Sequence, residues 1–466
     1  MDRRIAVTLA VGGCVTGACQ YDPPSDRQPV DAALDAVVVD ARPGPFVLTF
    51  GGEQEARFDV QAAPDGGAAF AGWNLGARFQ VGSVRIDRPG LVVGRLDPDG
   101  VVRWVRGLEA PTGGANTRVA IAPNGDVVVA GAFAGTMSLG SSTLVAAGLY
   151  DVFVLVMDAA TGEVVGAVGV RGEDDEGDFL HDIALDEQGN VYVAATFTGP
   201  FSVCGVSHNA SGVSVGYLAR LDARGLFCRW ERVAIGSPSS SNAAIGVAFN
   251  QRVFFGVNSY GDLALGGGLL SDRGGSDIVL ASFEPATGAH VASTRLGGAG
   301  LERAARIDSA GSAVFLSGEL IGPMSLGGGG AVVSPNQGDH FVARFDAASL
   351  AHVWARAMGL DRRVSGYFSL DGGELALTGN INASVSVGGE VLVPAGGRDA
   401  LFARYSVVDG SHMESAVMGG LGNDDGIAQS GTPHGRMWSG WFSGALTVSA
   451  QTFPAIGVSD VFVVRQ

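Results

Sequence analysis

The side chains that could do chemistry in this protein are limited first by one missing type. The 466-residue sequence contains no lysine, so all of its positive side chains are arginines. Without an ε-amine the chain cannot form Schiff bases, build a P-loop phosphate site or use a Ser/Lys dyad. Acidic residues outnumber basic ones by 47 to 30, which gives a net charge of −17. This balance predicts no nucleic-acid partner, because nucleic-acid binding depends on clustered Lys and Arg.

The four cysteines fall into two pairs with different expected roles. Cys14 and Cys19 lie near the N-terminus, whereas Cys204 and Cys228 lie in the middle of the chain. In an exported protein, a pair such as the second favours a disulfide over a metal site. We therefore predict a disulfide between Cys204 and Cys228, with two free buried cysteines as the alternative.

Two acidic runs raise the question of calcium. Asp174, Asp175 and Asp178 belong to one run, and Asp424 and Asp425 to the other. Calcium binds several carboxylate oxygens on a flexible loop, but neither run has the alternating spacing of a calcium-binding loop. The sequence therefore favours solvated acidic loops. Calcium is the only cofactor considered for this chain, and no metal site is predicted.

Five further aspartates each begin an apolar segment. We expect them to organise turns through hydrogen bonds from their side chains to nearby backbone groups. They are Asp151, Asp277, Asp339, Asp399 and Asp460.

The seven histidines do not form a converging set of metal ligands. His290, His352 and His412 recur at one phase of a repeat and should lie apart, as solvated residues on an outer rim. A zinc site needs its ligands about 2 Å from one ion, so this spread argues against zinc. The other four have no evident partners: His181, His208, His340 and His434.

One serine matches the letters of a hydrolase nucleophile elbow. Residues 212–216 read Gly-Val-Ser-Val-Gly, with Ser214 at the centre. That motif has meaning on a strand-to-helix turn, whereas here it leads into an apolar strand pattern. We interpret the match as chance and predict no catalytic residue. A pair of carboxylates would suit polysaccharide cleavage, but nothing in the sequence selects one pair.

The N-terminal segment has the composition of an export signal. Residues 1–19 contain two early arginines and then a short apolar stretch, and Thr16-Gly17-Ala18-Cys19 resembles a bacterial lipobox. We predict lipidation at Cys19, with Cys14 as the second candidate and an ordinary signal peptide as the alternative. Residues 20–45 are rich in Pro and Asp and should form an extended tether.

A pattern of about sixty residues recurs seven times along the rest of the chain. Each copy contains an apolar strand that ends in a small residue, a second short strand of period two, and a third strand that five copies begin with Asp. Glycine, at 73 residues, suits a turn-rich β protein. The small residues that end the first phrase are Gly72, Gly131, Ala195, Gly256, Gly318, Gly379 and Gly440.

The two ends of the chain predict a closed ring. The last copy stops after Asp460–Gln466, where the other six continue into a fourth strand. The missing strand lies at the other end, because residues 46–52 match residues 292–298 and 414–420. An N-terminal strand that completes the C-terminal blade removes exposed edges at the seam. We therefore predict an all-β fold over residues 46–466, a seven-bladed β-propeller with about four strands per blade.

The recurring phrases resemble a bacterial cell-surface family with seven-bladed β-propeller repeats of the SBBP type. The hallmark of that family is an Asp- or Ala-led strand, a turn that ends in Gly-Asn, and then a strand of the form Val-Tyr-Val-x-Gly. Its nearest copies here are residues 183–195, which read Ile-Ala-Leu-Asp-Glu-Gln-Gly-Asn-Val-Tyr-Val-Ala-Ala, and residues 121–131. Other copies depart from this pattern; residues 254–256, for example, lack the preceding Gly-Asn. The resemblance implies a propeller and an extracytoplasmic setting, but it supplies no catalytic residues.

These observations favour a noncatalytic binding or scaffolding module at the bacterial envelope. We expect an exported monomer, either an outer-membrane or cell-surface lipoprotein or a periplasmic protein, that meets the membrane only through its N-terminal lipid. The expected partner is an unknown protein or glycan, and the acidic balance favours a basic or metal-bridged one. The alternatives are an envelope hydrolase or lyase that acts on polysaccharide through channel carboxylates, and a purely structural surface protein.

Overall fold

The structure, a computed structural model, divides the chain at the end of the N-terminal segment. The division falls between Arg42 and Pro43. The described residues all belong to the unit Pro43–Gln466: 45–52, 57–76, 78–140, 142–172, 177–209, 213–236, 241–327, 330–333, 339–358, 364–371, 373–432, 435–448, 451–455 and 458–465. The predicted signal, tether, Cys14 and Cys19 lie outside them. No helix in these residues is long and apolar enough to span a bilayer.

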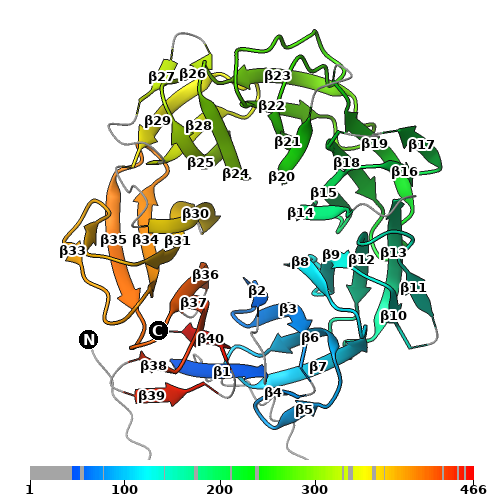
Figure 1. Cartoon of the computed structure of the whole chain (residues 1–466). Coiled ribbons are helices and arrows are strands. Elements are labelled where there is room, and N and C mark those ends of the chain that lie inside the picture. Colours follow the sequence, from blue (N-terminus) through cyan, green and yellow to red (C-terminus); the bar gives the residue numbers. More distant parts are fainter. Residues whose placement is uncertain are drawn as a thin grey trace, which may run out of the picture. The chain divides into compact units, whose positions relative to one another are not determined.

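Every element in the described part of the chain is a strand, and the strands form a β-propeller around a central opening (Figure 1). The innermost strands are β2 (Arg57–Ala62), β8 (Gly114–Ile121), β14 (Phe179–Leu185), β20 (Asn242–Asn250), β24 (Leu301–Ala310), β30 (Val364–Asp371) and β36 (Asp424–Thr432). Second strands pair with them: β3 (Ala68–Asn74), β9 (Val127–Phe133), β15 (Val191–Phe197), β21 (Arg252–Ser259), β25 (Ala313–Ile321), β31 (Glu374–Ile381) and β37 (Gly435–Phe442).

The outer half of each blade repeats the antiparallel pairing. Third strands are β6 (Gly90–Leu96), β12 (Asp151–Met157), β18 (Val215–Leu221), β22 (Asp277–Phe283), β28 (Asp339–Asp346), β34 (Asp399–Ser406) and β40 (Asp460–Arg465). Fourth strands are β7 (Val102–Glu109), β13 (Val164–Gly172), β19 (Cys228–Ala234), β23 (His290–Leu296), β29 (His352–Ala357), β35 (His412–Met418) and β1 (Phe46–Gly52).

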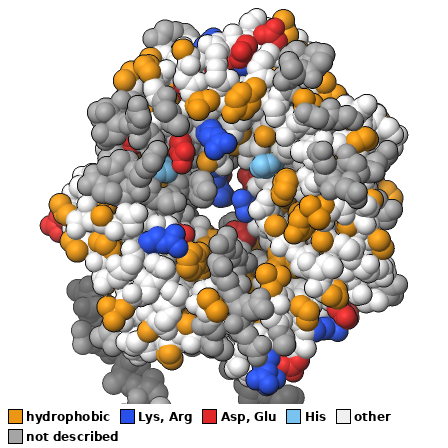
Figure 2. Space-filling view, viewed as in Figure 1, with side chains coloured by type: hydrophobic (Ala, Val, Ile, Leu, Met, Phe, Trp, Pro, Cys, Tyr) orange, Lys and Arg blue, Asp and Glu red, His pale blue; other side chains and the backbone are white. Residues whose placement is uncertain are grey.

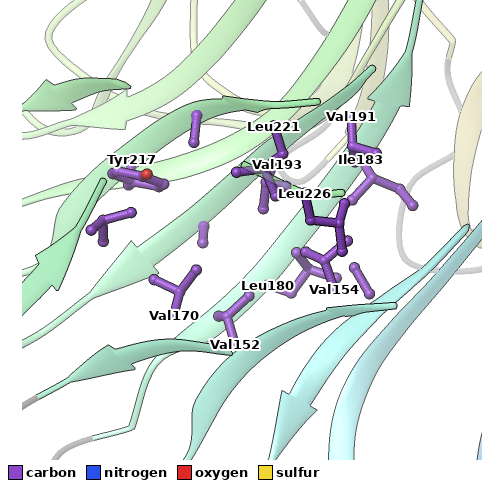
Figure 3. Close-up of a cluster of buried hydrophobic side chains, with 14 of the residues drawn as sticks. Val152, Val154, Val170, Leu180, Ile183, Val191, Val193, Tyr217, Leu221 and Leu226 are labelled. Carbon is purple, nitrogen blue, oxygen red and sulfur yellow. The ribbon is translucent and has the colours of Figure 1, made fainter. Parts of the chain in front are cut away.

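The core lies between neighbouring blades. Every residue of β9, β12 and β15 is buried, since these middle strands are covered on both faces, as their continuous apolar runs require. One cluster joins Val152 and Val154 of β12 to Val191 and Val193 of β15 (Figure 3). The recurrent small residue has a packing role here, because a Cβ at Gly131 would lie 2.8 Å from the Phe153 ring.

The ring closes as the chain ends predicted. β1 pairs antiparallel with β40, from Phe46 opposite Arg465 to Gly51 opposite Asp460. Phe50 is fully buried, and its ring centroid lies 4.6 Å from that of Phe70 in the first blade. The N-terminal strand therefore completes the C-terminal sheet and also packs on the first blade.

Short hairpins form part of the connections between second and third strands. They are β4 (Phe79–Val81) with β5 (Val84–Ile86), β10 (Thr136–Ser138) with β11 (Thr143–Val145), β16 (Pro200–Val203) with β17 (Val206–Asn209), β26 (Met324–Gly327) with β27 (Gly330–Val332), β32 (Val385–Ser386) with β33 (Val391–Leu392), and β38 (Ala445–Val448) with β39 (Gln451–Pro454). β4 pairs with β1 and β16 with β13, so these hairpins reach the fourth strand of the preceding blade. Three single bridges repeat this contact: Gly236↔Leu263, Gly297↔Ser325 and Gly419↔Thr447.

The hydrogen-bonded sheets do not divide into the seven separate blades that the sequence predicted. One eight-stranded sheet spans β14 to β23, because Val215 of β18 pairs in parallel with Asn242 of β20. The β1–β4 and β13–β16 pairs extend two further sheets to six strands. Hydrogen bonds between neighbouring blades therefore make the number of sheets differ from the number of repeats.

The closure can be tested with Phe50→Ala. We expect the free energy of unfolding to fall by about 3–5 kcal/mol, because the change leaves a cavity between β1 and the first blade. Urea denaturation measures the effect, and Val408→Ala, at a side chain that is 70% exposed, is the matched control. A loss below about 1 kcal/mol would show that β1 does not hold the seam.

Candidate functional site

The central opening brings together charged side chains from different innermost strands. Arg118 of β8 lies beside Asp182 of β14, with Nε 3.9 Å from Oδ1. On β24, Arg306 Nε lies 3.5 Å from Asp308 Oδ2. Asp182 also interacts electrostatically with Arg306 and with Asp59 of β2. Basic and acidic side chains are visible at the opening in Figure 2. These five residues, Asp59, Arg118, Asp182, Arg306 and Asp308, are called the channel cluster below.

Backbone groups of the following blade position two of these carboxylates. The N–H of Val119 on β8 donates to Asp59 Oδ2 at 2.8 Å. The N–H of Leu370 on β30 donates to Asp308 Oδ2 at 3.2 Å. Each carboxylate therefore bridges two innermost strands as well as facing its charged neighbours.

Burial shifts the proton affinities of this cluster. It raises the pKa of Asp308 to about 6, although Arg306 lowers that pKa, and it also raises the pKa of Asp182. Burial lowers the pKa of the adjacent His181 to about 4, and the Arg118 charge adds to this effect. His181 Nε2 lies 2.8 Å from Thr196 Oγ1. The cluster can thus present both charges to a polar ligand, and Asp308 can exchange a proton near neutral pH.

Sequence reasoning missed the channel cluster because its members are scattered through four repeats. One signal was present, since Asp59, Arg118 and Asp182 each lie thirteen residues before the small residue that ends the first phrase. A shared phase on the innermost strand places side chains at equivalent positions around the ring.

The structure joins Cys204 and Cys228 in a disulfide, with their Cα atoms 5.3 Å apart. Cys204 follows β16 and Cys228 begins β19, so the bond ties the hairpin of one blade to that blade's fourth strand. Both cysteines pack against the cluster of Figure 3.

The acidic runs differ from the solvated loops that we expected. Asp178 and Asp424 are buried at 2% and 0% exposure, because each enters the junction between two blades, and Asp425 is half-buried. Asp174 and Asp175 lie outside the described residues. Within the described ranges, no group of three or more His, Cys, Asp or Glu side chains has a metal-binding arrangement.

The predicted turn role of the strand-leading aspartates is confirmed at three positions. Asp151, Asp277 and Asp399 each accept a hydrogen bond on Oδ2 from the backbone N–H four residues earlier, at 2.8, 2.9 and 2.5 Å. Asp339 and Asp460 are also buried.

The expectation of solvated rim histidines was wrong in one respect. His290, His352 and His412 do lie on separate fourth strands, β23, β29 and β35. Each is half-buried, however, and its Nε2 is covered. Glycines of the overlying connections explain this, since added Cβ atoms at Gly267, Gly330 and Gly389 would meet these rings at 2.5–2.6 Å.

The remaining candidates do not come together in one site, although His181 and His208 have partners that the sequence did not show, Thr196 and Glu231. His208 Nε2 lies 2.7 Å from Glu231 Oε1, and His340 is buried at the start of β28. His434 lies outside the described residues. Ser214 directly precedes the strand β18, so it lacks the strand-to-helix turn of a nucleophile elbow.

The disulfide can be tested with the double variant Cys204→Ser/Cys228→Ser. We expect it to lose about 3 kcal/mol of unfolding free energy, because the bond constrains a loop with a sequence separation of 24. Chemical denaturation measures the loss. A reducing agent should destabilise the wild type by a similar amount and leave the variant unchanged; equal sensitivity of both proteins would argue against the bond.

Asp308 should make stability depend on pH. Its pKa rises from 3.8 to about 6 on folding, so its contribution is full below pH 3.8 and is lost as pH rises through 6. We expect a loss of about 1–2 kcal/mol between pH 5 and pH 7, allowing for partial solvent screening and the facing Arg306 and Asp182. Asp308→Asn should flatten this part of the profile in urea titrations. An unchanged slope would contradict the assignment.

No family model matches this chain, and no curated protein matches it. Solved structures with a similar overall arrangement were found at low identity. BamB from Moraxella catarrhalis is 11% identical, over 90% of this chain and 100% of that one, with a TM-score of 0.35. The Neurospora crassa Pan2 WD40 domain is 11% identical, over 89% of each chain, with a TM-score of 0.41. The β-propeller domain of the Trilobed protease from Pyrococcus furiosus is 7% identical, over 88% of this chain and 97% of that one, with a TM-score of 0.41. Likenesses of this size do not indicate a function.

Proposed function

We propose that this protein is a noncatalytic binding or scaffolding module of the bacterial envelope. The proposal includes export by residues 1–19, a lipid on Cys19 and a tether over residues 20–45. It also includes membership of the SBBP-type surface family and a ring of seven blades. The count is supported by the antiparallel quartets from β2-β3-β6-β7 to β36-β37-β40-β1, one for each sequence repeat.

The observation that carries the binding role is the placement of exposed apolar side chains. In an antiparallel blade, the connections from second to third strands and from fourth strands to the next blade leave at the same end. Most of the exposed large apolar residues of the described chain lie in these connections or at their ends. Those nearest the strand ends are Leu75, Leu149, Phe179, Ile235, Tyr260, Leu301, Leu421 and Val458, called the apolar face below.

A concentration of this kind is typical of an interaction surface. Leu421 is 91% exposed, and Phe179 and Leu301 begin innermost strands beside the opening. Hydrophobic side chains gather around that opening in Figure 2. Together with the net charge of −17, the face suits a partner that combines apolar anchors with positive charge.

One observation favours the enzyme alternative. Asp308 and Asp182 lie in the channel cluster with raised pKa values, as a proton donor near neutral pH requires. An envelope hydrolase or lyase would bind polysaccharide over the opening and protonate a leaving oxygen from one of these carboxyls. Such an enzyme should release reducing ends from envelope polysaccharide and lose this activity on Asp308→Asn.

The binding role is tested by affinity capture with residues 20–466 from envelope and extracellular extracts. We expect a saturable partner whose affinity falls at least about tenfold when Leu301→Asp and Leu421→Asp are combined, since they place charge on an apolar contact. Val101→Asp combined with Val408→Asp, two exposed residues on turns between third and fourth strands, is the matched control. Equal capture by both double variants would contradict the assigned face, and sugar release without a partner would favour the enzyme.

A further inference from the structure

Pairs of buried acids meet where one blade passes to the next. The N–H of Glu302 donates to Ser276 O at 2.9 Å, which brings Glu302 beside Asp277. In the same way, the N–H of Asp424 donates to Arg398 O at 2.7 Å, which brings Asp424 beside Asp399. All four side chains are at most 1% exposed. Two carboxyl groups buried together need either a positive charge nearby or a shared proton, because neither water nor distance relieves the repulsion between two charged ones.

At the first junction the protein supplies that charge itself. Arg295 of β23 is 3% exposed, and its Nε lies 2.5 Å from Asp277 Oδ2. Its Nη2 also lies 2.8 Å from Asp272 Oδ1. The guanidinium therefore pairs with Asp277, one member of the acid pair, and offsets its negative charge.

At the second junction a neutral residue takes the place of the arginine. Arg295 pairs with Val279, two residues after Asp277, and the equivalent pair in β34–β35 joins Val417 to Leu401, two residues after Asp399. Val417 therefore occupies the register position of Arg295. The nearby Arg398 guanidinium lies 5.7 Å from the centre of the Trp441 ring. In the described residues, no arginine or histidine forms an ion pair with Asp399 or Asp424.

One oxygen of each carboxyl in this second pair faces Gly419. A Cβ at Gly419 would lie 2.6 Å from Asp424 Oδ2 and 2.7 Å from Asp399 Oδ1, so the absence of a side chain lets both carboxyls approach the same point of the backbone. Asp399 Oδ1 is buried and has no hydrogen-bond partner. A cavity of about 970 Å³ is lined in part by Asp399, Val417 and Gly419, so the Asp399 side of the pair adjoins it.

We propose that a divalent cation of the Ca²⁺ class binds between Asp399 and Asp424, in the role that the Arg295 guanidinium has at the preceding acid pair. Hard carboxylate oxygens suit this cation, which takes six to eight oxygen ligands and completes its shell with backbone carbonyls and water. The site joins β34 to β36 and so links the sixth repeat to the blade that contains the ring closure. The inference does not depend on the proposed function.

Calcium titration of EDTA-treated protein, residues 20–466, at pH 7.5 tests this site. By calorimetry we expect binding with a Kd of roughly 10⁻⁴–10⁻³ M, as in extracellular calcium modules. Calcium should also raise Tm in a saturable way, since it binds only the folded state. Asp399→Asn and Asp424→Asn should each weaken this binding at least about tenfold, because each removes a charged ligand. Asp425→Asn, with the same charge change one residue away, should bind like the wild type.

A second variant supplies the missing charge within the chain. Val417→Arg places a guanidinium at the register position of Arg295, so its Tm in EDTA should approach that of the calcium-loaded wild type. Its response to calcium should be lost. This measurement decides the question even if the asparagine variants fail to fold.

Three results would overturn the proposal. Calcium affinity that is equal in the wild type and both asparagine variants would place the ion elsewhere. A calcium response that Val417→Arg leaves unchanged would also place the ion elsewhere. Absence of any response to calcium, with stability that falls as pH rises through 6, would show that the two carboxyls share a proton instead of a metal ion.

Discussion

The hydrogen bonds that pass from one blade to the next hold this ring together. Middle strands such as β9 and β12 are apolar on both faces, so no blade can bury its own core without neighbours on each side. The hairpin β16 pairs with β13 of the preceding blade, and the N–H of Glu302 donates to the carbonyl of Ser276 across another junction. At the seam, β1 supplies the same continuity by pairing with β40 and packing Phe50 on the first blade.

The charged groups of the protein follow from these junctions. Acids that begin third strands hold a local turn, and where a second acid arrives from the next blade, both become buried beside a glycine. Arg295 forms an ion pair with Asp277 of one such pair, whereas Val417 occupies the equivalent position at the other. In the channel, Asp59 and Asp308 likewise accept hydrogen bonds from the following blade while they face arginines. These polar groups therefore hold neighbouring blades together, whether or not a ligand binds to them.

This arrangement separates two surfaces with different uses. The channel cluster is held by backbone hydrogen bonds and ion pairs from several blades, so a change there affects several strands at once. The apolar face lies on connections at the strand ends, where a substitution disturbs the hydrogen bonds of the sheets least. The Cys204–Cys228 disulfide adds a covalent link between one such hairpin and the fourth strand of its blade.

Local patterns in the amino-acid sequence were enough to predict the β-propeller, the closure by residues 46–52 and the turns held by Asp151, Asp277 and Asp399, because each depends on a period or on neighbours a few residues apart. The division into hydrogen-bonded sheets, the burial of Asp178 and Asp424, and the cover over His290 could not be read in this way. Nor could the meeting of Arg118 with Asp182 or of Asp399 with Asp424. These features join residues from different repeats, and only the closed ring sets which of them share buried space and therefore which charges need a partner.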